Sequence, residues 1–398
     1  MNLFKISVAN IRHKPLRAAL SIILMAFGVG MISLLYTVQT QFKEQFDRNI
    51  KDIDMVLGAK GSPLQLILSS VYQVDAPTGN INLQETERFL KNPMVKGMVK
   101  EWIPMSYGDN FQKYRIVGTE HAYAEHYGAT LDNGRLYESD FEVTLGSKVA
   151  QETGLKLGDT FFSSHGLDDT TDVHKNHAYK VVGVFEPTRS VVDNLMLCNL
   201  SSVWRVHEKP DEPPMAEEDK EITAVLVKTS NLLASVRIPG MLRDSKIMVS
   251  LPAIEVNRLN KNFGIGMDAF TAIGILIMIL SAISVFIALY SSLRERRYEL
   301  ALMRTMGGSR FTILTMIVME GALMSLIGFV VGWVLSRIGL LVLSAVLEDR
   351  FHYGLTDLAP SFTDLVLLVI TIFVGKMASL LPAVKAMRID ISNTLADG

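Results

Sequence analysis

The sequence has few cysteines and few charged residues. Its 398 residues include one cysteine, Cys198, so the chain forms neither an internal disulfide nor a metal cluster held by several thiolates. Charged residues make up 20% and hydrophobic residues 49%, whereas a soluble domain usually carries about a quarter charged residues. The net charge is -2, and basic residues gather only beside apolar segments, which excludes nucleic acid as a partner. This composition indicates an integral membrane protein with a sizeable soluble part.

Motifs of nucleotide-binding and hydrolytic enzymes are also missing. The segments that start at Gly58 (GAKGS) and Gly375 (GKM) lack the spacing or the final hydroxyl of the G-x-x-x-x-G-K-[ST] loop that cradles ATP phosphates. Neither an H-E-x-x-H motif nor a G-x-S-x-G nucleophile elbow occurs. We therefore expect no enzyme, no catalytic residue and no ATPase site in this chain.

Four apolar runs are long enough to cross a membrane, whose hydrocarbon core of about 30 Å takes about 20 helical residues. They cover residues 18–38, 269–293, 311–347 and 362–384. Between the first and second runs lie about 230 residues, 39–268, which suffice for a core of their own. We predict four transmembrane helices with a large domain inserted between helices 1 and 2.

The third run, 311–347, is too long for one perpendicular crossing, because its 37 residues would extend roughly 55 Å as a helix. One interpretation is an outer extension beyond Trp333, with Arg337 at or beyond the outer interface and a short outer loop at 348–361. The other is a strongly tilted helix.

Basic residues beside the runs predict the orientation, because lysine and arginine near span ends stay in the cytoplasm. They precede run one, separate runs two and three, and follow run four: Lys5, Arg12, Lys14, Arg17, Arg294, Arg296, Arg297, Arg304, Arg310, Lys385 and Arg388. We expect both termini, the 294–310 loop and the 385–398 tail inside, with residues 39–268 outside the cytoplasm.

Residues 1–17 combine an apolar face at Leu3, Ile6 and Ile11 with several basic side chains. This pattern predicts an amphipathic helix at the inner interface that breaks at Pro15. An ordinary basic flank is the alternative.

The extracytoplasmic segment mixes short strand patterns with helical ones. The strand patterns are EVTLGSKVA, KYRIVGT, YKVVGVF, EITAVLV and KIMVSL, and the helical ones are LQETERFLKN, GSKVAQETGLK and PAIEVNRLNKNF. We predict an α+β domain.

The apolar residues of the segment 58–70 could face a lipid or hydrophobic cargo. The interpretation that we prefer is that these residues pack on the outer extension of span three.

The 294–310 segment, RERRYELALMRTMGGSR, holds seven charges in seventeen residues between two apolar runs. Such a segment must reach water or another protein. A helix from Arg294 to Thr305 would place Tyr298, Leu300 and Met303 for apolar contact, and Gly307-Gly308 would end it. Its charged side chains, available for charge matching with a partner, are Arg296, Arg297, Glu299 and Arg304. The alternative is a basic loop that only fixes topology.

The same segment carries a resemblance. ERRYELALMRTMGGSR, Glu295 to Arg310, resembles the ERxxExGxLRAxGxxR loop of MacB/FtsX-type ABC transporter permeases, whose relatives include lipoprotein-release, macrolide-exporter and haem-exporter permeases. The likeness extends to KPLRAALSIILMAFGVGM, VTLGSKVAQETGLKLGDTF, YKVVGVFEP and SLLPAVKAMRIDISNTL. Leu302 departs from a usual small or valine-like residue, and Ile391 to Leu395 (ISNTL) departs from the usual Pro-x-Glu-Ala-Leu ending.

The resemblance implies a homodimeric permease of the bacterial inner membrane, driven by a separate cytoplasmic ABC ATPase that binds ATP and magnesium. The loop would be a coupling helix seated on that ATPase, with motion passed to the extracytoplasmic domain, a mechanism called mechanotransmission. Its coupling residues would be Glu295, Arg296, Arg297, Glu299, Leu300, Met303, Arg304, Gly307 and Gly308.

Two functions agree with such a permease. The first is export or extraction of a hydrophobic, lipidic or metal-related cargo. The second is a non-transporting ABC-type regulator of an envelope protein partner, for which a periplasmic protein is one possibility.

Two ionisable residues fall inside predicted spans, where charges are costly and usually paired. Glu320 and Lys376 both lie roughly 13 Å from the inner ends of their helices. We predict an ion pair or a shared polar network, with snorkelling of Lys376 as the alternative.

Span one carries a set of small residues, which let helices approach closely in lipid: Ala18, Ala19, Ala26, Gly28, Gly30 and Ser33. They predict either a homodimer seam or tight packing within one subunit.

A cluster of His165, His174 and His177, interleaved with aspartates, lies in the extracytoplasmic segment. Imidazole and carboxylate groups suit zinc. The alternative is a solvated loop without metal.

Overall fold

The computed structural model describes residues 3–13, 15–164, 173–206, 215–351, 354–355 and 357–388. The chain divides into two compact units. We call Met1–Phe42 with Asn262–Gly398 the helical unit, and Lys43–Lys261 the sheet unit.

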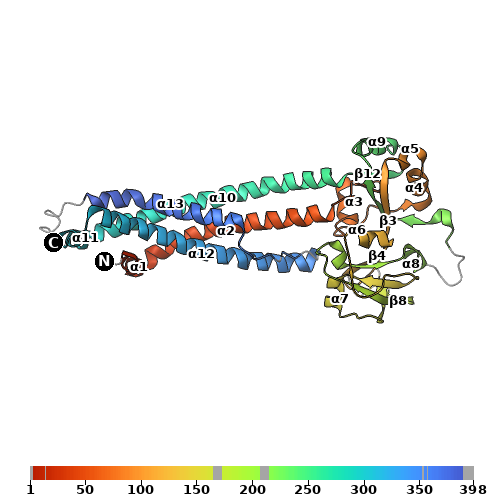
Figure 1. Ribbon diagram of the computed structural model, residues 1–398, viewed down its shortest axis with the longest axis horizontal. Helices are drawn as coiled ribbons and strands as arrows, with labels where there is room; N and C mark the ends of the chain where they lie inside the picture. The colour runs from red at the N-terminus through yellow and green to blue at the C-terminus, as the bar shows by residue number, and fades with distance from the viewer. Residues whose placement is uncertain are drawn as a thin grey trace. The chain divides into compact units, whose positions relative to one another are not determined.

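Long apolar helices form most of the helical unit. The helices are α1 Leu3–His13, α2 Pro15–Asn49, α10 Pro252–Glu295, α11 Arg297–Thr305, α12 Arg310–Phe351 and α13 Phe362–Met387. Among the described residues, four of them (α2, α10, α12 and α13) are long and apolar enough to cross a membrane. Figure 1 shows these four side by side, with α1 and α11 at one end of the bundle. The predicted four-helix membrane architecture is confirmed.

The run at 311–347 belongs to one uninterrupted helix, α12, whose 42 residues exceed what a perpendicular crossing needs. The segment before α2 is also helical. Ser7, on the packed face of α1, is buried and donates a hydrogen bond to the carbonyl of Met316 in α12, with an oxygen-to-oxygen distance of 3.3 Å. Leu3, Ile6 and Ile11 pack against the core of the bundle, so this helix is held by other helices.

Small residues set the close contacts of the helical unit. A Cβ added to Gly30 would lie 2.9 Å from the carbonyl oxygen of Gly332 in α12, and one added to Gly28 would lie 3.2 Å from the backbone nitrogen of Met278 in α10. Such distances leave no room for a larger side chain, which is how helices approach closely in lipid. These two glycines therefore pack within one subunit, while a homodimer seam on span one stays a prediction.

The sheet unit contains a mixed sheet of ten strands among the described residues, and the five predicted strand patterns overlap five of them. Its strands are β1 Met55–Ala59, β3 Val99–Phe111, β4 Tyr114–Thr119, β5 Leu131–Gly134, β6 Glu142–Leu145, β7 Thr160–Ser164, β8 Val173–Phe185, β9 Leu195–Cys198, β11 Ala224–Thr229 and β12 Ile247–Ser250. The strand order is β12-β1-β11-β3-β4-β9-β6-β8-β5, and β7 pairs with β3 and β8. β2 Ile81–Asn82 and β10 Glu221–Ile222 form a separate antiparallel pair.

Short helices cover the sheet. They are α3 Pro63–Ser70, α4 Leu83–Leu90, α5 Pro93–Lys96, α6 His121–His126, α7 Ser147–Thr153, α8 Leu200–Arg205 and α9 Ala234–Met241, with 3-10 turns at Val191–Asn194 and Glu217–Asp219. Figure 1 shows α4, α5 and α9 grouped beside β12, and α7 beside β8. The predicted α+β domain between the first two membrane helices is confirmed.

Cys198 is a fully buried core residue, and burial raises the pKa of its thiol well above the ordinary value.

The apolar residues of α3 do not lie where the sequence analysis placed them. Leu66 and Ile67 are fully buried in the core of the sheet unit itself. The expectation that this segment offers exposed apolar side chains, or packs on span three, is therefore wrong at these positions.

Glu142, the first residue of β6, fixes the turn that precedes it. Its carboxylate accepts hydrogen bonds from the Arg135 guanidinium and from the backbone N–H groups of Glu138 and Ser139, at 3.0 and 3.1 Å. The Arg135 hydrogen bond lowers the pKa of Glu142 to about 2.

We predict that Glu142→Gln weakens this turn at pH 7 by about 1 kcal/mol, a small value because solvent screens the partly exposed pair. A lowered native pKa stabilises the fold above the unfolded pKa of the carboxyl, and the effect is lost as the pH falls from there to about 2. Hydrogen exchange of β6 peptides, corrected for intrinsic rates, should therefore separate variant from wild type at pH 7 and less so at pH 3. Glu138→Gln is the control, because that side chain is 71% exposed. Equal protection of both variants at pH 7 would refute the role of Glu142.

Candidate functional site

The segment between α10 and α12 forms a separate short helix. α10 ends at Glu295, and Arg296 departs from helical geometry with φ -106° and ψ 16° before α11 begins at Arg297. Gly307 ends the turn after α11 with φ +96°, a conformation that favours glycine. A Cβ on Gly308 would lie 2.7 Å from the carbonyl oxygen of Met303. The backbone conformation at Gly307 and the close approach at Gly308 both favour glycine, as the sequence predicts. The helix itself, Arg297–Thr305, is shorter than the predicted 294–305.

One face of α11 packs against the membrane helices. Leu300 is 1% exposed and Ala301 is fully buried. Leu300 belongs to a core cluster with Leu289, and Met303 packs against the same cluster. The prediction that Leu300 and Met303 give apolar contact to an outside partner is therefore wrong, because both face the bundle.

The opposite face of α11 is exposed and partly apolar. Tyr298, Leu302 and Met306 are 51%, 45% and 76% exposed. Their spacing of four residues places them along one side of the helix, between the exposed charges of Arg297 and Glu299. Sequence reasoning selected Tyr298 but missed Leu302 and Met306, although their i, i+4 spacing was available. We call Tyr298, Leu302 and Met306 the α11 outer face.

Arg296 connects α11 to the interior of the bundle. Its guanidinium Nε lies 3.2 Å from a carboxylate oxygen of Glu299, and Nη1 lies 3.9 Å from Glu320 of α12. Glu320 is 5% exposed. A small hollow between Arg296 and Glu320 is lined mostly by apolar side chains, among them Leu300. A displacement of the α10–α11 junction would therefore act directly on α12.

Glu295 ties the end of α10 to α2. Its carboxylate accepts a hydrogen bond from Arg17 at 2.9 Å, and the same guanidinium also donates to the Ser291 hydroxyl. Together with Arg296, this contact links the α11 segment to two membrane helices, α2 and α12.

The predicted pair between Glu320 and Lys376 is wrong within this chain. Glu320 is buried and faces Arg296, whereas Lys376 lies on the exposed side of α13. The reason is helical phase. Gly375 is the α13 residue that packs into α12, at Gly321 and Ser325, and the next residue points about 100° away from it. Equal depth in two neighbouring helices did not imply a shared face.

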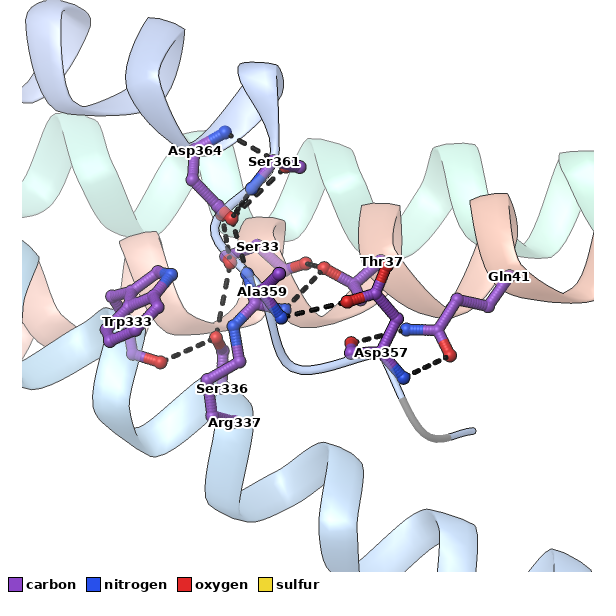
Figure 2. Close-up of polar contacts among 10 residues, drawn as sticks. All are labelled: Ser33, Thr37, Gln41, Trp333, Ser336, Arg337, Asp357, Ala359, Ser361 and Asp364. Carbon is purple, nitrogen blue, oxygen red and sulfur yellow. Dashed lines mark hydrogen bonds and ion pairs between the residues drawn. The ribbon is translucent and has the colours of Figure 1, made fainter. Parts of the chain in front are cut away.

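A buried polar cluster joins α2, α12 and α13 (Figure 2). Arg337 of α12 forms an ion pair with Asp364 of α13, and the two residues are 7% and 5% exposed. The Ser33 hydroxyl of α2 donates to Asp364 at 2.7 Å, and Arg337 donates to the Thr37 hydroxyl at 3.0 Å. Ser361, the N-cap of α13, shares a capping box with Asp364. The carboxylate is therefore held by three separate parts of the chain.

Further contacts enclose this cluster. Ser336 lies 3.2 Å from Ser33, measured between their hydroxyl oxygens, and the Arg337 guanidinium lies 5.3 Å from the centre of the Trp333 ring. Arg337 was expected to mark the outer interface or an extension beyond it. The structure buries its charged group between α2, α12 and α13, beside the first turn of α13, and its depth relative to the membrane stays a prediction. Asp364 was missed, although the Ser361 to Asp364 spacing resembles a capping box.

The proposed zinc ligands lie largely outside the described residues. This holds for His165 and for the side chain of His174. The His177 ring stacks on Phe141, with 4.6 Å between ring centres. Zinc binding by these histidines stays a prediction.

With this geometry in place, comparisons with known proteins identify the family. Residues 18–236 match the MacB-like periplasmic core domain, and residues 271–391 match the C-terminal domain of FtsX-like permeases. The first match alone covers more than half of the chain. The chain belongs to the MacB/FtsX family of ABC transporter permeases and is a multi-pass membrane protein.

Individual relatives are distant. The chain is 23% identical, over 97% of both proteins, to the ABC transporter permease YvrN of Bacillus subtilis strain 168. Two solved structures are similar to part of it. The periplasmic region of MacB from Actinobacillus actinomycetemcomitans shows 14% identity over 53% of this chain and 95% of its own, with a TM-score of 0.36. The extracellular domain of YknZ from Gram-positive bacteria shows 13% identity over 49% and 98%, with a TM-score of 0.30.

We predict that Asp364→Ala or Arg337→Ala strongly destabilises the protein, because each leaves the other charge buried without its partner. The expected loss is about 3 to 5 kcal/mol. The double variant Arg337→Met with Asp364→Leu should regain much of this stability. Thermal unfolding of the detergent-solubilised chain measures the effect, with Ser361→Ala as the control for the lost helix cap. Additive losses in the double variant would contradict an energetic pair.

Proposed function

We propose that this chain is the permease subunit of an ABC transporter of the cytoplasmic membrane. A separate cytoplasmic ATPase hydrolyses ATP, and the permease transmits the resulting motion to its extracytoplasmic domain to export or extract a hydrophobic cargo. The chain would act as a homodimer, with both termini in the cytoplasm. The basic residues at the α11 end of the bundle support this orientation, because such residues stay on the cytoplasmic side.

The observation that carries the proposal is the two-sided character of α11. Leu300 and Ala301 fix one side of this helix to the bundle, and Arg296 reaches the buried Glu320. The other side presents the α11 outer face, whose apolar side chains are flanked by charge. A helix that shows apolar anchors within a polar surround fits into a groove of a partner. Motion of that partner would then displace α10 and α12 together.

We predict that Leu302→Asp with Met306→Asp reduces co-purification of the cognate ATPase at least tenfold, because two carboxylates would be desolvated against an apolar groove. The measurement is the amount of ATPase retained on tagged permease in detergent.

Ser309→Asp is the matched control. Ser309 is exposed and its hydroxyl accepts from the backbone N–H of Thr312 at the start of α12, a role that aspartate also fills. This variant adds negative charge beside α11 without touching its outer face. Normal ATPase retention by the double variant would refute docking through this face.

The sheet unit offers an apolar surface for the cargo. Leu232, Leu233 and Val236 lie at the start of α9 and are 89%, 62% and 74% exposed. Adjacent exposed apolar residues of this size mark interaction sites. They support a hydrophobic cargo without identifying it.

We expect a photoreactive amino acid at Leu232 to capture a lipidic or other hydrophobic small molecule in intact membranes, in amounts that rise with ATPase activity. Mass spectrometry of the purified adduct reads the result, and the same probe at the exposed, charged position Glu85 is the control. Exclusive capture of one envelope protein would instead favour the regulatory function.

A further inference from the structure

An apolar groove of about 510 Å³ runs between α10 and α13 in the helical unit. Ile275 and Phe286 mark its extent along α10, and Val374 and Leu381 mark its extent along α13. All residues that line it are apolar, and the small side chains among them are those of Ala282 and Ala378. The groove therefore lacks any polar group that would bind a hydrated ligand along its length.

The length of this groove matches one leaflet of a membrane. From Ile275 to Phe286 α10 rises about 16 Å, about half of a hydrocarbon core about 30 Å thick, and from Val374 to Leu381 α13 rises about 10 Å. A single acyl chain lies along such a length. The end of the groove at Phe286 is the end nearer to α11, where the basic residues of the bundle gather.

A basic group follows the groove at that end. Tyr290 lies one turn beyond Phe286 on α10, and Lys385 lies one turn beyond Leu381 on α13. The Lys385 ammonium donates to the Tyr290 hydroxyl at 2.6 Å and lies 4.6 Å from the centre of its ring. Arg294 lies one further turn beyond Tyr290 on α10. An ammonium and a phenol side by side provide donors for phosphate oxygens.

We propose that this groove is a specific binding site for an anionic phospholipid. One acyl chain fills the groove between α10 and α13, and the lipid phosphate receives hydrogen bonds from Lys385 and Tyr290. The site uses neither the α11 outer face nor the ATPase, so it stands apart from the proposed coupling function. A bound lipid would fill the space between α10 and α13 on the side of the bundle that leads to the α10–α11 junction.

A second copy of the chain fits this groove less well. Two subunits related by a twofold axis along the membrane normal keep each residue at the same depth, so the basic end of one groove would face residues at that level in the other copy. If the groove of one copy packed on that of the other across this axis, Lys385 and Arg294 of the two copies would face each other, and like charges would meet. A lipid phosphate supplies the missing negative charge.

Native mass spectrometry of the full-length, detergent-purified protein tests the proposal, with dioleoyl phosphatidylglycerol and dioleoyl phosphatidylcholine as probes. We expect the wild type to bind the anionic lipid at least tenfold more tightly. Lys385→Gln should remove most of this preference, and Lys385→Gln with Tyr290→Phe should abolish it. Ala282→Trp, which fills the groove, should weaken binding of both lipids at least tenfold.

The matched control is Lys376→Gln, which removes the same charge from the same helix on its exposed side, away from the groove lining. It should bind both lipids as the wild type does. Equal binding of the two lipids by the wild type, or an unchanged preference in Lys385→Gln, would overturn the proposal.

The rival occupant has its own test. Met377 lines the groove and is 47% exposed, so Met377→Cys in a Cys198→Ala background should remain un-crosslinked between copies in membranes. Efficient disulfide formation between two chains would show that the groove is a subunit interface and would likewise overturn the proposal.

Discussion

The contact between Arg296 and the buried Glu320 makes the α11 segment part of the membrane bundle. A carboxylate at 5% exposure is costly in an apolar bundle unless a cation faces it, and here that cation is Arg296, the residue between α10 and α11. The junction is therefore held by electrostatics as well as by the packing of Leu300. In the proposed mechanism, motion of α11 would reach α12 through this contact and through Leu300.

A second buried ion pair, between Arg337 and Asp364, also connects membrane helices. Asp364 joins α13 to Arg337 of α12 and Ser33 of α2, so three membrane helices share one ion pair and its hydrogen bonds. Between the two clusters, contacts at Gly30 and Gly332 bring α2 and α12 into close approach. These contacts hold α2, α12 and α13 together at separate positions along the bundle.

Much of the fold follows from sequence. Apolar runs located the membrane helices, and alternating patterns located β4, β8, β11 and β12, because both depend on local periodicity. The contacts of the α11 segment were harder to predict from the sequence. Glu320 was recognised as a buried charge, but its partner depended on helical phase, which depth alone does not give. Likewise, the pattern of α11 did not tell which apolar side would face the bundle, so Leu300 was assigned to the wrong side and Leu302 was overlooked.

In the proposed complex, the α11 outer face contacts the ATPase while the opposite face of α11 stays in the bundle. Photocrosslinking from single positions on this helix, in membranes that contain the whole complex, tests it most directly. We expect efficient crosslinks to the ATPase from Leu302 and none from Leu300, two residues apart. Crosslinks from Leu300 and none from Leu302, or none from either, would contradict it.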